Sequence, residues 1–336
     1  MFNQQHAQFA LLRILAVLMV LFTGAGPYGA STSEARTLSN DGGSSPTLIP
    51  GCKWIVPFDP NNFSNPTQID NKWLPLIPGT QMTLEGRADR GGGLLPHKVV
   101  FTVTDLTKVI NGVRTLVIWD RDFNDDHLEE AELALFAQDD AGNVWNLGEY
   151  PELYYQNGQF RGAPDTWFAG LRDAEGGIHM LARPQLGTPR YLQGSVPKIA
   201  FLDCAKVFLM HQRTCVPFDC YGNALVTDEV SPLDLAGGHQ RKYHAPGVGI
   251  VQVGAVGDPE GETLVLTNLV HLSPEALAEA RGEALKLDTH GYQTRPILYG
   301  QTPPAEVGGL DFEAGNENQN SGQVQGFTLY LPVILK

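Results

Sequence analysis

A run of acidic and amide side chains between residues 120 and 130 is the part of the chain best suited to chemistry. Five of its side chains offer oxygen ligands at nearly alternate positions: Asp120, Asp122, Asn124, Asp126 and Glu130. Calcium takes about six to eight oxygen ligands, so this spacing predicts a calcium site if the side chains converge. An EF-hand loop would instead need glycine at Asp125 and glutamate at Ala131. The solvated end of a β-hairpin also explains these residues and is the preferred interpretation.

A second set of side chains combines aromatic rings with polar groups. Its members are Trp119, Trp145, Glu149, Tyr154 and Trp167. If these rings were exposed on a sheet, they would form a platform for a glycan or for an apolar or amphiphilic ligand. Large aromatic side chains are usually buried, so a place in the core is the preferred interpretation.

The sequence gives no catalytic residue. It lacks Gly-x-Ser-x-Gly, His-Glu-x-x-His and the Ser-x-x-Lys set of motifs, which mark common hydrolases. His127, His239 or His244 would have to pair with a carboxylate for acid–base chemistry. Glu129 and Glu130 are adjacent, so on a strand they point to opposite faces and cannot share a proton. A hydrolase assisted by a metal at residues 120–130 therefore remains an alternative only.

The acidic run lies in a stretch that is typical of an antiparallel meander. Four strands are predicted, at residues 99–110, 113–123, 127–138 and 143–156. The turn signal Asn111-Gly112 separates the first two, because both central residues of a tight hairpin turn need positive φ. In the first strand, Val99, Phe101 and Val103 share one face.

Further strand-like segments occupy residues 200–272, and a helix is predicted near residues 274–287. Ser273 can cap this helix, and Pro274 takes its first position. The predicted fold class is mainly β: an antiparallel meander forming a curved sheet or a partly open barrel, with one C-terminal helix. Such a sheet has a concave face, where a ligand can bind.

Composition and the first residues indicate an exported protein. The net charge of −14 argues against nucleic acid and anionic membranes as partners. Residues 1–13 and the apolar run at 14–26 have the pattern of a signal peptide, with cleavage expected after Ala30 or Ala35. The apolar run is too short to span a membrane comfortably, although an uncleaved anchor is the alternative. We expect a secreted or cell-surface protein with no membrane span after cleavage.

Export favours disulfides over a thiol or zinc site for the four cysteines: Cys52, Cys204, Cys215 and Cys220. A zinc site with His211 would need a close Cys-x-x-Cys pair, which the sequence lacks. Four cysteines allow three connectivities. A hairpin centred on Gln212 would place Cys204 opposite Cys220 and leave Cys52 to pair with Cys215.

The chain divides into four predicted segments. They are a signal peptide at residues 1–30, a flexible linker at 31–50, a single β-rich domain at 51–305, and a polar linker with a short apolar tail at 306–336. The tail ends in FTLYLPVILK, which is either an edge strand of the domain or an exposed recognition tag.

Four motifs, in order, are IDN-W-LPL-IPGT, FAQDDAGNVWNLGE, ARPQLGTPRY and KYHAPGVGIV. Together they resemble a widespread family of uncharacterised secreted bacterial β-rich proteins, with the pattern IDN-W-LPL-PGT, AQD-GNVW and KYYAPGVG. The likeness covers roughly residues 58–272 and implies shared architecture and export, but no activity. This chain departs from the family at residues 134–136, where relatives carry an acidic residue, and at Gln240, where relatives often have Glu.

The leading functional hypothesis is a secreted, non-catalytic protein that binds an apolar or amphiphilic ligand or a glycan in the concave face of its sheet. The alternatives are the metal-assisted hydrolase and a structural component of the cell surface held through the C-terminal tail. Calcium is the single cofactor that the residues suggest.

Overall fold

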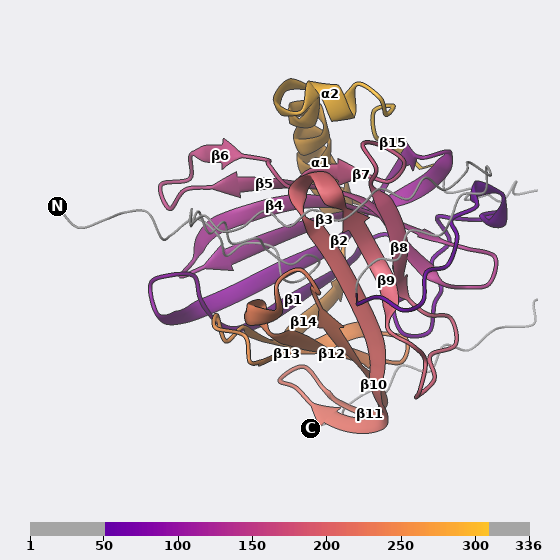
Figure 1. Cartoon of the computed structure of the whole chain (residues 1–336). Helices are drawn as coiled ribbons and strands as arrows, with labels where there is room; N and C mark the ends of the chain where they lie inside the picture. Colours follow the sequence, from indigo (N-terminus) through magenta and orange to yellow (C-terminus); the bar gives the residue numbers. More distant parts are fainter. Residues whose placement is uncertain (1–50, 309–336) are drawn as a thin grey trace, which may run out of the picture.

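The computed structural model describes residues 51–308. The predicted signal peptide, the flexible linker and nearly all of the C-terminal tail lie outside this range. As predicted, the fold is mainly β and antiparallel, with a helix towards the C-terminus (Figure 1). Within residues 51–308, the helices are too short or too polar to cross a membrane.

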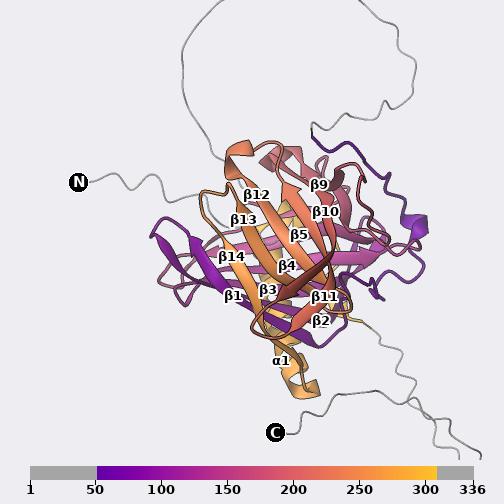
Figure 2. The same cartoon turned by 90° about the horizontal axis from the view of Figure 1, so that it is seen from below.

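Twelve strands close into a barrel, so the prediction of a curved or partly open sheet is wrong. The order around the ring is β1–β14–β13–β12–β11–β10–β9–β8–β5–β4–β3–β2, and β2 pairs back with β1 (Figures 1 and 2). The closing pair runs from Gln81 opposite Thr102 to Asp89 opposite Leu94. Closure removes the free edges of the sheet and encloses the inward-facing side chains of every strand.

The barrel strands are β1 (Thr80–Asp89), β2 (Leu94–Ile110), β3 (Val113–Asn124), β4 (His127–Gln138), β5 (Val144–Tyr154), β8 (Glu175–Met180), β9 (Tyr191–Val196), β10 (Phe201–Cys215), β11 (Cys220–Val230), β12 (His239–Ala245), β13 (Gly249–Val256) and β14 (Thr263–His271). Short strands β6 (Phe160–Gly162) and β7 (Trp167–Phe168) pair with β5, and β15 (Glu306–Val307) pairs with β2. The helices are α1 (Pro274–Thr294) and α2 (Pro296–Tyr299), and three 3-10 turns are η1 (Pro60–Asn62), η2 (Pro197–Ile199) and η3 (Leu235–Gly237).

The predicted meander corresponds to β2, β3, β4 and β5. Asn111 and Gly112, between β2 and β3, have φ values of 48° and 83°, as the tight-turn signal predicts. Asp125 and Asp126, between β3 and β4, also have positive φ, at 49° and 62°. Aspartate tolerates this conformation better than most residues, so acidic residues at this position form the turn as well as carry charge.

Helix α1 begins as predicted but continues beyond its expected end. Ser273 caps the helix by accepting a hydrogen bond from the Ala276 amide. The helix then runs to Thr294. Gly291 lies within the helix and packs against Tyr299, whose ring would lie 2.2 Å from an added Cβ. The glycine serves a close contact between α1 and α2.

Two ion pairs fix α1 to the outside of β2. The buried Lys108 ammonium donates to Asp288 at 2.9 Å, to the Tyr292 hydroxyl at 3.2 Å and to a backbone carbonyl. Arg281, seven residues before Asp288 on α1, pairs with Asp105, three residues before Lys108 on β2. Helix α1 therefore packs against the outer face of the barrel at β2 (Figure 2).

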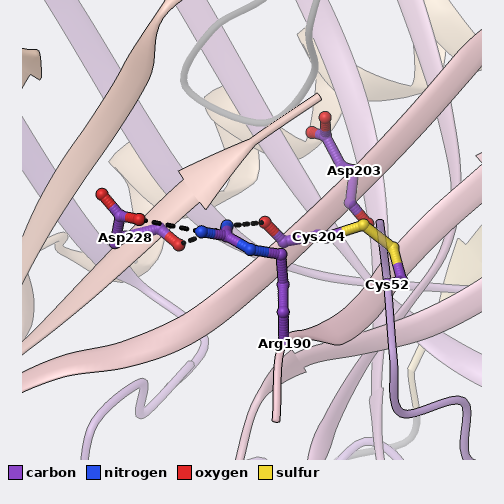
Figure 3. Close-up of a disulfide and its surroundings, with 5 residues drawn as sticks. All are labelled: Cys52, Arg190, Asp203, Cys204 and Asp228. Carbon is purple, nitrogen blue, oxygen red and sulfur yellow. Dashed lines mark hydrogen bonds and ion pairs between the residues drawn. A yellow bond between two sulfur atoms is a disulfide. The ribbon is translucent and has the colours of Figure 1, made fainter. Parts of the chain in front are cut away.

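The four cysteines form two disulfides, as predicted, but the predicted connectivity is wrong. Cys52 bonds to Cys204 (Figure 3). Cys215 bonds to Cys220. The hairpin between β10 and β11 turns at residues 216–219 and not at Gln212, which places Cys215 opposite Cys220. Register shifts along this hairpin then bring Cys204 opposite Val230.

The two disulfides should differ in their effect on stability. Loop-closure entropy predicts a loss of about 5 kcal/mol in the free energy of unfolding when Cys52 and Cys204, 152 residues apart, are both changed to alanine. The matched control Cys215→Ala/Cys220→Ala opens a separation of 5 residues and should lose only about 2 kcal/mol. Urea denaturation measures both values. Equal losses would show that loop entropy does not govern these crosslinks.

Candidate cation site in the barrel interior

Alternate residues of the β3–β4 hairpin place acidic side chains inside the barrel. Asp120 and Asp122 on β3 are paired with Glu132 and Glu130 on β4, and paired residues share a face. On its other side, Asp122 is paired with the fully buried Val99 of β2. All four acidic residues are buried, with exposed fractions between 2% and 9%.

Electrostatics across the barrel agree with this inward orientation. The charge of Lys242 on β12 lowers the pKa of Glu149 on β5, although burial raises it more and these strands are not neighbours. Lys242 itself is buried and lies 2.6 Å from Glu229 of β11. A polar region therefore extends through the interior from the β3–β4 hairpin to the opposite wall.

Buried oxygen atoms without a hydrogen-bond partner are concentrated in this one hairpin. They belong to Asp120 (Oδ1), Asp122 (Oδ1), Asn124 (Oδ1), Glu129 (Oε2), Glu130 (Oε2) and Glu132 (Oε1). Folded proteins leave few buried polar atoms unpaired, because each one costs about 1–3 kcal/mol. The Glu130 and Glu132 side chains also hydrogen-bond to each other, but one oxygen of each has no partner. The concentration of such oxygens in one hairpin indicates a role other than stabilising the fold.

A histidine from β2 reaches the same group of acids. His97 Nδ1 lies 3.2 Å from Asp122 Oδ1, and Nε2 lies 2.9 Å from Oε1 of Glu262, which directly precedes β14. Possible ligand atoms of His97, Asp122 and Glu262 all lie within 4.8 Å of one another, which would suit a metal ion. Arg90, which follows β1, lies 3.3 Å from Glu262 and 3.7 Å from Asp122.

Acids outnumber bases in this part of the interior. One guanidinium (Arg90) and one imidazole (His97) lie among seven carboxyl groups: Asp120, Asp122, Glu129, Glu130, Glu132, Glu260 and Glu262. An excess of buried like charges cannot stay ionised without compensation.

The pKa values of these groups follow from this imbalance. Burial, followed by repulsion from Asp122, raises the pKa of Asp120 to about 7 and that of Glu129 to about 7. Burial and neighbouring carboxylates also raise the pKa of Glu132 well above its usual range. Burial would raise the pKa of Glu262 too, but the His97 hydrogen bond and the Arg90 charge lower it to about 2. The pKa of Glu262 is therefore lowered, while the pKa values of the β3–β4 acids are raised by burial and mutual repulsion.

Four of the five predicted calcium ligands lie in this interior region, namely Asp120, Asp122, Asn124 and Glu130. The fifth, Asp126, does not: its side chain is 96% exposed in the turn, 3.7 Å from Lys98. The acidic run is therefore buried on its alternate residues, and is not the solvated hairpin end that was the preferred interpretation.

The predicted ligand-binding aromatics do not form one exposed face. Trp167 is buried and donates to Glu149 at 2.9 Å, and Trp145 is buried and donates to Asp139 at 2.8 Å. The other two lie elsewhere. Trp119 lies on the outer face of β3, stacked 3.9 Å from the Arg121 guanidinium, and the Tyr154 hydroxyl donates to Glu152.

The histidines considered for catalysis lie away from the acidic cluster. His127 is exposed in the turn, and His239 lies 3.1 Å from Asp228, part of a different ion-pair network. His244 is buried, and burial lowers its pKa to about 3. The histidine that lies beside the acids is His97. It is two residues before Val99 and on the same face of the strand, so extending the predicted alternation by two residues would have identified it.

A separate pocket of about 680 Å³ opens on the outside of the protein. Its lining includes Lys53, Trp54, Asp140, Arg183 and Pro189. The Trp54 side chain is 38% exposed and contacts Tyr191 edge-on. This pocket, unlike the barrel interior, offers an exposed aromatic ring.

No protein-family model and no curated protein matches this chain. Solved structures with some similarity include a Bacteroides fragilis protein described as exported and as having a YmcC-like fold, with 14% identity and a TM-score of 0.31. Another is a Parabacteroides distasonis protein described as a lipoprotein, with 11% identity and a TM-score of 0.32. Each match covers 60% of this chain and 99% of the other. TM-scores this low carry no argument, and the family resemblance of the motifs stays a prediction.

The raised pKa values predict that the metal-free protein loses stability as the pH rises from about 4 to about 7. Asp120 and Glu149 titrate near 7 when folded and near 3.8 and 4.5 when unfolded, so the folded state binds more protons in this range. Each extra proton lowers the free energy of unfolding by about 1.4 kcal/mol per pH unit. His179 and His244 act in the opposite direction, because burial lowers their pKa values to about 4 and about 3.

Urea denaturation with a chelator present, at pH 5 and pH 7.5, measures this slope. Glu132→Gln should reduce it, because the amide holds no titratable proton, whereas Glu279→Gln on the exposed side of α1 should leave it unchanged. A free energy of unfolding that rises with pH over this interval would contradict the raised pKa values of the buried acids.

Proposed function

We propose that the protein is an exported, non-catalytic binding protein that holds a divalent metal cation inside its barrel. The observation that carries this proposal is the set of buried, unpaired oxygens of the β3–β4 hairpin, at Asp120, Asp122, Asn124 and Glu130. Carboxylate and amide oxygens are ligands for divalent cations, including the calcium expected from the spacing of these residues. A bound cation would replace the protons that these acids otherwise need to stay buried.

Export is supported by the chemistry of the cysteines. All four cysteines are in disulfides, and the Cys52–Cys204 bond is buried beside β9 and β10 (Figure 3). Disulfides of this kind persist in oxidising compartments outside the cytoplasm. The predicted signal peptide is consistent with the same location.

The geometry favours binding over catalysis. A hydrolytic metal site keeps an open position for water and substrate. Here the acids lie inside a closed barrel, and His97, the histidine beside them, is 2% exposed with Nε2 engaged by Glu262.

A divalent cation should stabilise the folded protein against heat at pH 7.5. Binding at a free concentration of about 100 times the Kd adds about 2.7 kcal/mol to the free energy of unfolding. Differential scanning fluorimetry with calcium, magnesium and zinc chlorides measures the shift in Tm. The shift should increase with cation concentration.

The variant Asp120→Asn/Glu130→Gln should lose this shift, because it removes two charged ligands without removing their volume. Asp126→Asn is the matched control, since Asp126 belongs to the same hairpin but is exposed. It should respond as the wild type does. The proposal fails if no divalent cation shifts the Tm, or if the control and the double variant behave alike.

A second candidate function is glycan binding at the outer pocket. The observation that favours it is the exposed Trp54 ring at a pocket that also contains Lys53 and Arg183. Sugar rings stack on exposed aromatics, and cationic side chains can donate to hydroxyl or carboxylate oxygens. The sequence analysis expected a glycan in the concave face of the sheet. In this candidate the glycan binds outside the barrel instead, because charged groups occupy the polar part of the barrel interior.

If this candidate is correct, neutral or acidic oligosaccharides should quench tryptophan fluorescence with saturation, and Trp54→Ala should weaken binding at least tenfold. Tyr155→Ala removes another exposed ring, which is 53% exposed and outside the pocket, and should have no effect. Unchanged affinity of the Trp54 variant would exclude this pocket as the site.

A further inference from the structure

We infer that the interior site takes a transition cation that binds nitrogen and oxygen, zinc(II) in the first place, with Nδ1 of His97 as a ligand. This inference rests on the proposed function, since it names the class of cation that the barrel holds. The evidence is the geometry around a single imidazole.

The first observation is that one side of the His97 ring is already fixed. Its Nε2 lies 2.9 Å from Glu262 Oε1, so the Nε2 proton is donated to a carboxylate. Glu262 is held in turn by Arg90 at 3.3 Å and by the Gln240 amide. Histidine ligands of metals usually donate their second N–H to a carboxylate in this way, which fixes the tautomer and leaves the other nitrogen free to bind.

The second observation concerns the other ring nitrogen. His97 Nδ1 faces Asp122 Oδ1 at 3.2 Å, yet neither atom has a hydrogen-bond partner with acceptable geometry. Both residues are buried, at 2% and 9% exposed. A buried nitrogen aimed at a buried carboxylate oxygen, without a hydrogen bond between them, is the arrangement expected for two ligands of one cation.

The distance between these atoms fits a small cation. Zinc binds histidine nitrogen and carboxylate oxygen at about 2.0–2.2 Å. Two ligand atoms 3.2 Å apart then subtend an angle of about 100° at the metal, between the octahedral and tetrahedral values. The other oxygen of Asp122, Oδ2, lies 3.7 Å from Arg90, so the guanidinium and the cation would use different oxygens of this residue.

Neighbouring residues can complete the coordination. Asn124 is directly opposite His97 on β3, and Glu130 is directly opposite Asp122 on β4. Both side chains are buried, at 4% and 6% exposed, and each has an oxygen with no hydrogen-bond partner. The amide oxygen of Asn124 is independent evidence for a ligand, because mutual repulsion of acids does not explain its lack of a donor.

The imidazole of His97 distinguishes transition cations from calcium and magnesium as ligands of this site. Calcium and magnesium take oxygen ligands and would leave Nδ1 unused, whereas zinc and related transition cations bind imidazole well. The rival explanation is a proton on Nδ1, which would make His97 a cation between two carboxylates. Binding measurements distinguish these explanations.

Isothermal titration of the metal-free, disulfide-bonded mature protein with zinc sulfate and with calcium chloride is the first test. Zinc should bind with 1:1 stoichiometry and at least tenfold more tightly than calcium. His97→Gln should weaken zinc binding at least tenfold and change calcium binding by less than threefold. His127→Gln, which removes an exposed histidine from the same hairpin, is the matched control and should bind zinc as the wild type does.

Zinc K-edge X-ray absorption of the wild type provides a test that does not depend on folding of a variant. The zinc-loaded protein should show a single imidazole together with oxygen ligands. Calcium binding that equals or exceeds zinc binding, or zinc bound without imidazole, would overturn this inference while leaving the proposed function intact. Failure of every divalent cation to bind would overturn both.

Discussion

Burial of carboxyl groups inside a closed sheet is the constraint on which the rest of this structure depends. Moving an ionised carboxylate out of water costs several kcal/mol even after the protein relaxes, unless a charge or hydrogen bond compensates for it. Only some of the interior carboxylates have such compensation. Lys242 compensates Glu229, and Arg90 with His97 compensates Glu262. Among the acids of the β3–β4 hairpin, Asp122 shares Arg90 and His97 with Glu262, whereas Asp120, Glu130 and Glu132 have no basic partner that an ion pair joins to them within residues 51–308. Protons or a bound cation would neutralise these three acids.

Closure of the barrel is what brings these groups together. The acids come from β3 and β4, His97 from β2, Arg90 from the turn after β1, and Glu262 from the start of β14. Gly86 on β1 is paired with both His97 and Leu264, and a Cβ there would lie 1.8 Å from the Thr263 carbonyl. A side chain at this position would therefore prevent the close approach of β1 and β14 that completes the ring beside His97.

The sequence predicts the local part of this arrangement well. The Asn111-Gly112 turn, the strands on either side of it and the cap at Ser273 all depend on neighbouring residues, and the structure confirms them. Alternation also placed Asp120, Asp122 and Asn124 on one face. It could not show that this face points inwards, because period two identifies two faces without saying which one is enclosed.

Non-local features were beyond such reasoning. Pairing of β1 with β14 joins segments far apart in the chain, and no turn signal encodes it. The disulfides were assigned wrongly because the β10–β11 hairpin turns at residues 216–219 and not at Gln212, which places Cys204 opposite Val230 and far from Cys220. Glu130 was a predicted calcium ligand, but considering only adjacent acids missed its pair with Glu132, two residues away on β4 and on the same inner face.

This dependence on closure links cation binding to folding. His97, Asp122 and Glu262 come from three separate strands or their ends, and they approach one another only when β14, β1, β2 and β3 are paired. The unfolded chain contains no such site, so a cation that binds it favours the closed barrel over every open form. For a protein that folds after export, the acids would then remain protonated until the ring closes around a cation. The same acids that weaken the metal-free barrel at neutral pH would hold the loaded barrel shut, which explains why a fold would retain them in its interior.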